Sequence, residues 1–129
     1  MRVYLDAAPV IYLVEQVEPH ASDLEKRLNI PGTVQVCSDL TRLECRVKPI
    51  RDRQPALLSA SDRYLSEIVA EVFPLSQQVI DQATLLRARY GFRTPDAIHL
   101  AAAIVYECDL FLTNDRRLSK CAEIAVETI

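Results

Sequence analysis

Glycine is scarce in this chain, with two residues among 129, and the sequence lacks the glycine-rich loops that hold nucleotide cofactors. Neither G-x-G-x-x-G nor G-x-x-x-x-G-K-S/T occurs, so nothing indicates dinucleotide or P-loop nucleotide binding. So few glycines also argue for a compact structure with few flexible linkers. The four cysteines include no C-x-x-C pair and lie in or beside apolar runs. That arrangement argues against a zinc site and favours buried, reduced thiols.

Long hydrophobic runs and a secretory signal are also missing. No apolar stretch approaches the length that a membrane span needs, and Arg2 and Asp6 leave no room for the apolar core of a signal peptide. We therefore expect a cytoplasmic protein without membrane contacts. The net charge of −3 provides no general attraction to nucleic acid. A phosphate-bearing substrate would therefore require a local basic patch or metal ions.

Short apolar runs alternate with amphipathic stretches along most of the chain. The apolar runs predict strands at residues 2–5, 34–37, 72–75, 110–112 and 124–126. The amphipathic stretches predict helices from Pro9, over residues 20–28, 39–48, 55–71 and 77–90, and again from Pro95. This alternation predicts a single domain over residues 1–129 with a three-layer α/β/α fold. Helices cover both faces of a mainly parallel sheet in such a fold.

Capping residues and apolar stripes locate several helices more closely. Ser38 is the expected cap of the helix that follows it. Thr94 is the expected cap of a later helix whose first residue is Pro95. The spacing of apolar residues along each helix predicts the side that faces the core. It places the following residues inward: Leu40, Leu43, Val47, Ile68 and Ile80.

Four acidic residues lie where these elements end or face inward. Asp6 directly follows the first strand, Asp96 lies in the first turn of a helix, and Asp115 follows the buried run 110–112. Glu44 shares the predicted inward side of its helix. Because the carboxyl ends of parallel strands open into one crevice, we expect the four carboxylates to converge there.

Each of these acids also has a local explanation. Asp6 and Asp96 could cap helices, and Asp115 could form a turn. Glu44 could complete a capping box with Thr41, or it could pair with an arginine in a buried salt bridge. Taken singly, each explanation competes with ligand binding, and the presence of all four acids favours a shared site.

Converging carboxylates would repel one another and raise their own pKa values unless cations were bound. Ligation by oxygen alone suits Mg²⁺ or Mn²⁺ rather than zinc. Such ions lower the pKa of a bound water, polarise a phosphoryl oxygen and stabilise a leaving oxyanion, and phosphodiester hydrolysis uses all three effects. No Ser/His/Asp or Cys/His arrangement competes with this reading. We expect His99, three residues after Asp96, to be a hydrogen-bonded core residue.

Four segments carry a resemblance to a known family: VYLDAAPVIYLVE, CSDLTRLE, TPDAIHLAAA and FLTND. Nearly end to end, the chain resembles PIN-domain proteins of the VapC toxin type. The resemblance implies a five-stranded parallel sheet, a Mg²⁺ or Mn²⁺ pocket, ribonuclease activity, and inhibition by a cognate antitoxin protein in a type II toxin–antitoxin pair. It also assigns catalysis and metal binding to Asp6, Glu44, Asp96 and Asp115, with Thr113 and Asn114 lining the pocket. The chain departs from the family at Ala7 and Ala8, where members often carry a hydroxyl or amide residue after the first aspartate.

Basic residues are densest around Glu44, where they form either a solvated helix face or a surface for phosphate contacts. The cluster consists of Arg42, Arg46, Lys48, Arg51 and Arg53. Our candidates for contacts with an RNA substrate are Arg42, Arg46 and Arg93. We also expect the protein to form a homodimer.

Two other functional classes remain open at this point. One is a catalytically idle PIN-like domain that serves only for interaction, which sequence patterns do not separate from an enzyme. The other is a phospho-receiver-like signalling module, which also combines a doubly wound sheet with an acidic Mg²⁺ pocket. A receiver would need a lysine at a late strand end, and Lys26, Lys48 and Lys120 do not occupy such a place.

Overall fold

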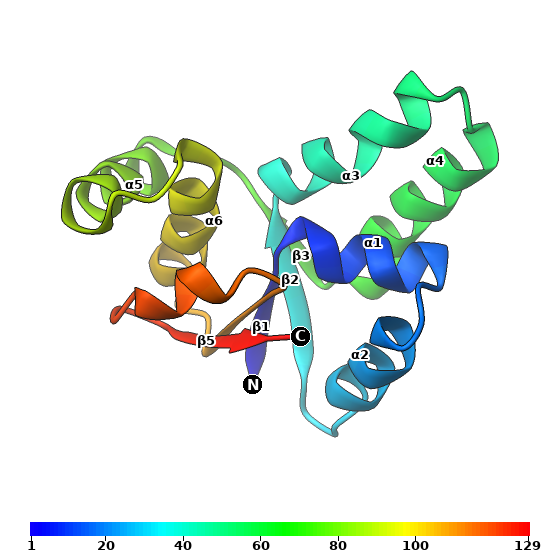
Figure 1. The fold of residues 1–129 in the computed structure, drawn as a ribbon, viewed down its shortest axis with the longest axis horizontal. Coiled ribbons are helices and arrows are strands. Elements are labelled where there is room, and N and C mark those ends of the chain that lie inside the picture. Colours follow the sequence, from blue (N-terminus) through cyan, green and yellow to red (C-terminus); the bar gives the residue numbers. More distant parts are fainter.

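The computed structural model describes all 129 residues and contains one parallel sheet of five strands (Figure 1). The strands are β1 (Arg2–Leu5), β2 (Val34–Ser38), β3 (Glu71–Phe73), β4 (Leu110–Thr113) and β5 (Ala125–Thr128). Their order across the sheet is β3-β2-β1-β4-β5, and every neighbouring pair is parallel. The α/β fold with a parallel, five-stranded sheet is therefore confirmed.

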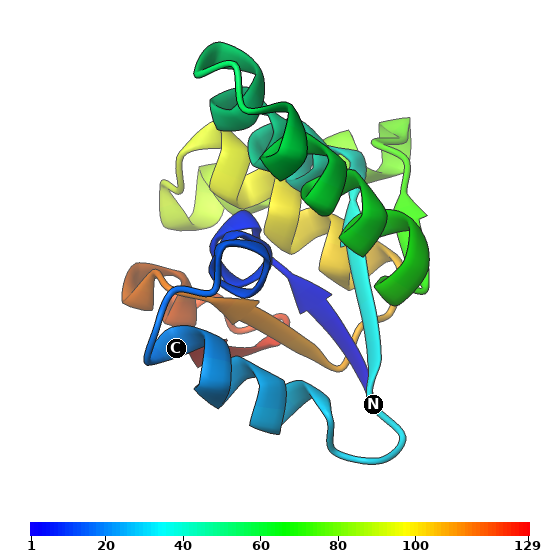
Figure 2. The ribbon, with the colours of Figure 1, turned by 90° about the vertical axis from the view of Figure 1, so that its right-hand side faces the viewer.

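Helices form a layer on each face of this sheet. The helices are α1 (Ala7–Glu15), α2 (His20–Leu28), α3 (Asp39–Arg51), α4 (Pro55–Arg63), α5 (Gln77–Tyr90) and α6 (Thr94–Val105). A π-helical turn, η1 (Tyr64–Ile68), follows α4, and a 3-10 helix, η2 (Arg116–Lys120), follows β4. Figure 2 shows α1, α2 and α4 in front of the sheet and α5 and α6 behind it. None of these helices has both the length and the apolar character of a membrane span.

Alternating side chains of the strands supply the two halves of the core. On β1, Tyr4 packs with α5 and α6, whereas Val3 and Leu5 pack with α1 and α2. Helix α6 lies close to the sheet because its inner side carries small residues. These residues are Ala97, Ala101, Ala102 and Ala103, and all four are completely buried.

Several apolar residues that we predicted to face inward lie on the surface instead. Leu43 and Val47 of α3 are 57% and 50% exposed, and Ile68 and Ile80 are also exposed. Helix α3 buries Thr41, Cys45 and Pro49, spaced four residues apart. The side that packs is therefore the one with compact side chains, and hydrophobicity alone selected the wrong face of this helix.

Helix boundaries differ from the predictions at three places. Helix α1 begins at Ala7, two residues before Pro9. The N-cap of α6 is Arg93, so Thr94 is the first helical residue and its side chain makes no cap. The predicted helix over residues 55–71 ends earlier, because the chain leaves the π-helical turn after Ile68 to enter β3. The predicted cap at Ser38 is confirmed, with Thr41 as its capping-box partner.

The four cysteines are free thiols. Cys37, Cys45 and Cys121 are buried, and Cys108 is half-buried. Burial raises the pKa of Cys37 and of Cys45 to about 12, which keeps both thiols protonated near neutral pH. The prediction of buried, unpaired thiols is therefore confirmed for three of them.

Candidate metal centre

Asp6 lies at the junction of β1 and α1, where two neighbouring groups fix its carboxylate. Its Oδ1 accepts a hydrogen bond from the backbone N–H of Ala7 at 2.8 Å. Its Oδ2 accepts one from Oγ1 of Thr113 at 2.8 Å. Because β1 and β4 are paired, with Leu5 opposite Leu112, the residues that follow them meet at the same sheet edge. Asp6 is thus both a helix cap and a member of the cluster.

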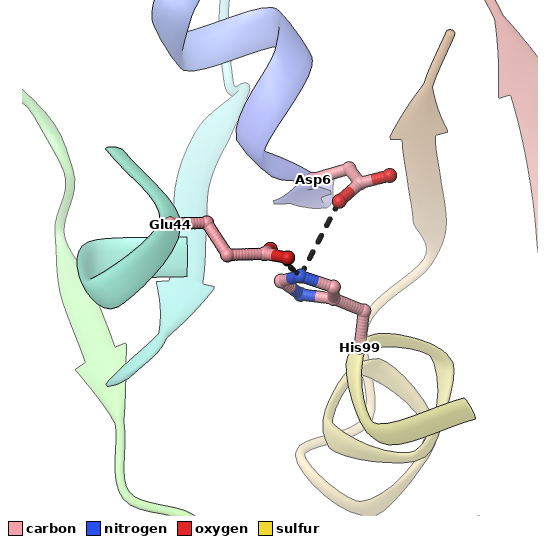
Figure 3. A group of neighbouring side chains, drawn as sticks. All are labelled: Asp6, Glu44 and His99. Carbon is pink, nitrogen blue, oxygen red and sulfur yellow. Dashed lines mark hydrogen bonds and ion pairs between the residues drawn. The ribbon is translucent and has the colours of Figure 1, made fainter. Parts of the chain in front are cut away.

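Glu44 and His99 complete a group of three side chains around one point. Figure 3 shows the carboxylates of Asp6 and Glu44 directed at the same nitrogen of the His99 ring. Nε2 of His99 lies 2.5 Å from Oε1 of Glu44 and 3.4 Å from Oδ1 of Asp6. One ligand atom from each of the three residues lies within 4.8 Å of the others. The partner of Glu44 is therefore a histidine, and neither the Thr41 capping box nor an arginine salt bridge accounts for its place.

His99 is 1% exposed and hydrogen-bonded, as predicted, but its position in the cluster was not foreseen. Its other ring nitrogen, Nδ1, lies 2.7 Å from the hydroxyl oxygen of Tyr4, a second residue that sequence reasoning missed. The only available signal was the spacing of three residues between Asp96 and His99, which places both on one side of α6.

Asp96 lies in the first turn of α6, as predicted, and is close enough to Asp6 and Asp115 to feel their charges. Burial raises its pKa, and the negative charges of Asp6 and Asp115 raise it further. The positive charge of Arg117 acts in the opposite direction. The carboxylate of Asp96 is therefore held close to like charges, which is the arrangement that a cation relieves.

Asp115 lies at the rim of the cluster and is engaged by an arginine. It caps η2 through the backbone N–H of Arg117, and its two oxygens accept from the guanidinium of Arg117 at distances down to 2.6 Å. These hydrogen bonds lower the pKa of Asp115. It therefore contributes to the field around Asp96, while its own carboxylate is turned toward Arg117.

The two predicted pocket residues behave differently. Thr113 is completely buried and donates to Asp6. Asn114 is exposed, and its side-chain amide donates to the hydroxyl of Tyr12 on α1 at 3.2 Å. Thr113 therefore supports the cluster directly, whereas Asn114 links β4 to α1 beside it.

The three candidate RNA-contact arginines lie in two places. Arg46 pairs with Asp62 at 2.9 Å, and Arg42 borders two open grooves of about 590 and 700 Å³ along α3. Neither groove is lined by Asp6, Glu44 or Asp96. Arg93 is exposed, and its charge contributes to the lowered pKa of Asp115. Arg93 is thus the candidate arginine that lies beside the acids.

The donor set fits a hard divalent cation. Asp6, Glu44 and Asp96 offer carboxylate oxygens, which Mg²⁺ and Mn²⁺ prefer as ligands. The raised pKa of Asp96 reflects in part a repulsion between carboxylates that a bound cation would remove. The residues present therefore match such an ion in both ligand type and charge.

A comparison with protein-family models finds one that covers almost the whole chain. The model is described as PIN domain, and it matches residues 3–124. The chain belongs to the PIN domain family. A PIN domain built on five parallel strands is what the resemblance implied. No curated protein matches the chain in a sequence comparison.

Solved structures of toxin–antitoxin proteins share this PIN fold. VapBC2 from Rickettsia felis, bound to a DNA fragment from its promoter, aligns with a TM-score of 0.81 and 15% identity over 99% of this chain and 98% of that one. DNA-bound VapBC from Salmonella typhimurium aligns with a TM-score of 0.79 and 15% identity, over 99% of this chain and 98% of that one. VapC20 from Mycobacterium tuberculosis is a toxin that cleaves the sarcin–ricin loop. It aligns with a TM-score of 0.73 and 19% identity, over 93% of this chain and 95% of that one. At these identities, the alignments show a shared fold.

Proposed function

We propose that this PIN domain is a metal-dependent endoribonuclease and the toxin of a type II toxin–antitoxin pair. The observation that carries the proposal is the convergence of Asp6 and Glu44 on one point, with Asp96 close enough to feel the charge of Asp6. PIN domains are generally nucleases, which supports the enzymatic class. Fold similarity to a toxin that cleaves the sarcin–ricin loop and to VapBC complexes supports the biological role.

In this proposal, Asp6, Glu44 and Asp96 hold Mg²⁺ or Mn²⁺, and Asp115 completes the shell or orients water. When bound, the cation supplies a lowered water pKa and a polarised phosphoryl oxygen. The chain itself contributes the position of the carboxylates that hold the cation. Thr113 and the N–H of Ala7 each hold one oxygen of Asp6, so that its carboxylate does not have to be ordered during the reaction.

Arg93 is placed to attract the RNA backbone toward the acids, and Arg42 and Arg46 offer a second contact surface along α3. Because the net charge of the chain is −3, such local groups have to supply the attraction to phosphate. We keep all three as proposed RNA contacts, of which Arg46 would first have to leave Asp62.

The test is cleavage of total cellular RNA, mapped at nucleotide resolution, with Mg²⁺ or Mn²⁺ and with a chelator. We expect discrete cuts that disappear with the chelator and in Asp6→Asn, which retains an oxygen for the cap at Ala7. Asp81→Asn, at an exposed acid of α5, is the matched control and should cut normally. A folded wild-type protein that binds Mn²⁺ but leaves all RNA intact would favour the idle interaction domain.

We also propose that an antitoxin segment restrains the enzyme at this same cluster. Converging carboxylates attract a guanidinium, which can bind them in a bidentate manner. A small cavity of about 20 Å³ between α1, α3 and α4 lies beside Glu44 and is lined by Ile11, Val14 and Leu57. An amphipathic helix of the partner would dock on this apolar side around Ile11 and Tyr12. Its affinity should fall as Mn²⁺ rises and when Asp96 becomes Asn; an affinity that ignores both changes would place the partner elsewhere.

The remaining expectations stay part of the proposal. The protein would act as a single domain over residues 1–129, as a homodimer, in the cytoplasm. Four cysteines without a disulfide suit a reducing compartment.

A further inference from the structure

A buried chain of hydrogen bonds runs from the sheet to Glu44. The hydroxyl oxygens of Ser38 and Tyr4 are 2.7 Å apart, and the Tyr4 oxygen is 2.7 Å from Nδ1 of His99. Nε2 of His99 then contacts Glu44 at 2.5 Å. Ser38 and Tyr4 are completely buried, and His99 is 1% exposed. Water therefore does not compete for the hydrogen bonds among these three residues.

Counting donors fixes the direction of this chain. Thr41 donates its hydroxyl hydrogen to the carbonyl of Leu5, so it has none for Tyr4. Ser38 already accepts from the N–H of Leu40, and Tyr4 is the available acceptor for its own hydrogen. Tyr4 therefore accepts from Ser38 and donates its single hydrogen to Nδ1 of His99. Burial raises the pKa of Tyr4, so the phenol keeps this hydrogen.

The contacts at the opposite end of the ring agree with this direction. Nε2 of His99 faces two carboxylate oxygens, from Glu44 at 2.5 Å and from Asp6 at 3.4 Å. An unprotonated Nε2 would direct its lone pair at two acceptors and leave a buried nitrogen without a hydrogen bond. Nε2 therefore carries the hydrogen, and it donates to Glu44.

We infer that His99 is a positioning residue that Ser38 and Tyr4 hold in its Nε2–H tautomer, so that it orients the Glu44 carboxylate for the cation and does not bind the cation itself. The inference rests on the proposed metal-dependent function and assigns roles within that site. His99 thereby has a different role from Asp6 and Glu44, the two carboxylates beside it, which would bind the cation. Glu44 keeps its second oxygen, Oε2, for the ion.

The packing around the His99 ring explains why this ring can orient the carboxylate of Glu44. The Tyr4 ring stacks on Phe111 with centroids 5.3 Å apart and meets the His99 ring edge-on at 5.8 Å. The side chain of Glu44 is 33% exposed, and it has several rotatable bonds to restrict. A rigid donor lowers the conformational entropy that Glu44 loses when it binds a cation.

The tautomer can be measured without metal or substrate, by two-bond ¹H–¹⁵N correlation spectra of the apo protein. The chain has two histidines, and His20→Gln assigns the signals by removing one set. We expect a pyrrole-like Nε2 and a pyridine-like Nδ1 for His99 in its neutral form. In Tyr4→Phe, we expect Nε2 to stay pyrrole-like because Glu44 still accepts its hydrogen, while the Nδ1 signal shifts because Nδ1 has lost its hydrogen bond from Tyr4. A pyridine-like Nε2 in the wild-type protein would overturn the inference.

The effect on metal binding is tested with Mn²⁺ and the same substitution. Tyr4→Phe should weaken Mn²⁺ binding by about threefold to tenfold, the range expected for one lost hydrogen bond that positions a ligand. Tyr64→Phe is the matched control, because its hydroxyl donates to Gln35 at 2.6 Å and takes no part in the site. It should lose a comparable hydrogen bond and bind Mn²⁺ as the wild-type protein does.

Electron spin-echo spectra of the Mn²⁺ complex address direct ligation. We expect no strong coupling to a ¹⁴N nucleus, and a directly bound imidazole nitrogen would overturn the inference. Unchanged Mn²⁺ affinity in Tyr4→Phe would overturn it as well. A wild-type protein that does not bind Mn²⁺ would instead overturn the proposed function, and the metal-positioning role of His99 with it.

Discussion

At the scale of single residues, the acids of the cluster differ in what neutralises them. Asp6 is held by two hydrogen-bond donors, and Glu44 is held by His99. Asp115 is paired with Arg117, whereas the pKa of Asp96 is raised by burial and by neighbouring carboxylates. Asp96 is therefore the acid whose charge costs the apo protein stability.

Replacing Asp96 with Asn should stabilise the apo protein at neutral pH. A folded-state pKa above the ordinary value of 3.8 means that ionisation is less favourable in the folded state. The resulting penalty is absent below pH 3.8, grows as the pH rises through the raised pKa, and is constant above it. We expect a melting temperature higher by about 1–4 °C at pH 7. Differential scanning fluorimetry with chelator measures this, and an unchanged or lower value would show that Asp96 has a structural role.

Arg117 screens the negative charge of the cluster. Its guanidinium donates hydrogen bonds to Asp115, and its positive charge lowers the pKa of Asp96. Arg117→Gln should remove this positive charge and tighten Mn²⁺ binding by about twofold to fivefold, as expected for an exposed charge. Arg116→Gln is the matched control at the neighbouring exposed position. Calorimetric titration of both variants gives the comparison, and equal affinities would mean that Arg117 does not screen the site.

At the scale of elements, helix α6 carries both the chemistry and the packing. Asp96 and His99 face the acids, and the alanine side of the same helix lies against the sheet. The close approach of α6 brings Nδ1 of His99 within 2.7 Å of Tyr4 on β1. Small side chains on α6 are therefore a condition for the geometry of the site.

Ala102→Leu should disturb this approach. The position is completely buried, so extra methyl groups have no free volume, and we expect a loss of about 1–3 kcal/mol in the free energy of unfolding. Ala88→Leu places the same side chain on an exposed position of α5 and should change stability little. Urea denaturation measures both, and equal stabilities would show that α6 does not depend on close packing.

At the scale of the whole molecule, α3 presents an apolar face that the monomer leaves in solvent. Leu43, Val47 and Ile50 are each at least half exposed. They lie along the groove of about 700 Å³ that Arg42 and Arg46 also border. In the homodimer that we expect, this face offers apolar area to bury.

Val47→Asp should therefore weaken the homodimer by about tenfold or more, since a charge would be placed in a desolvated contact. Leu85→Asp, at a position of α5 that is 60% exposed, is the matched control. Sedimentation equilibrium over a range of protein concentrations gives the dissociation constants. A dimer equally stable in both variants would place the interface on another face.

Local patterns in the sequence determined most of the fold. Alternating runs predicted the five strands and their parallel arrangement, because a strand buried on both faces reads as a continuous apolar run. Caps were predictable where a side chain bonds within its own turn, as at Ser38. The acids at strand ends could be named for the same reason, since their position depends on the chain immediately before them.

Only the tertiary structure decided which side chains meet. His99 and Glu44 are 55 residues apart, and no local signal pairs them, so their contact depends on how α3 and α6 pack at the sheet edge. The same packing exposed Leu43 and Val47, because the sheet and α1 accept the compact side of α3 and not its most apolar side. The direction of a side chain within a helix follows from its sequence position, but its partner is set by the neighbouring element.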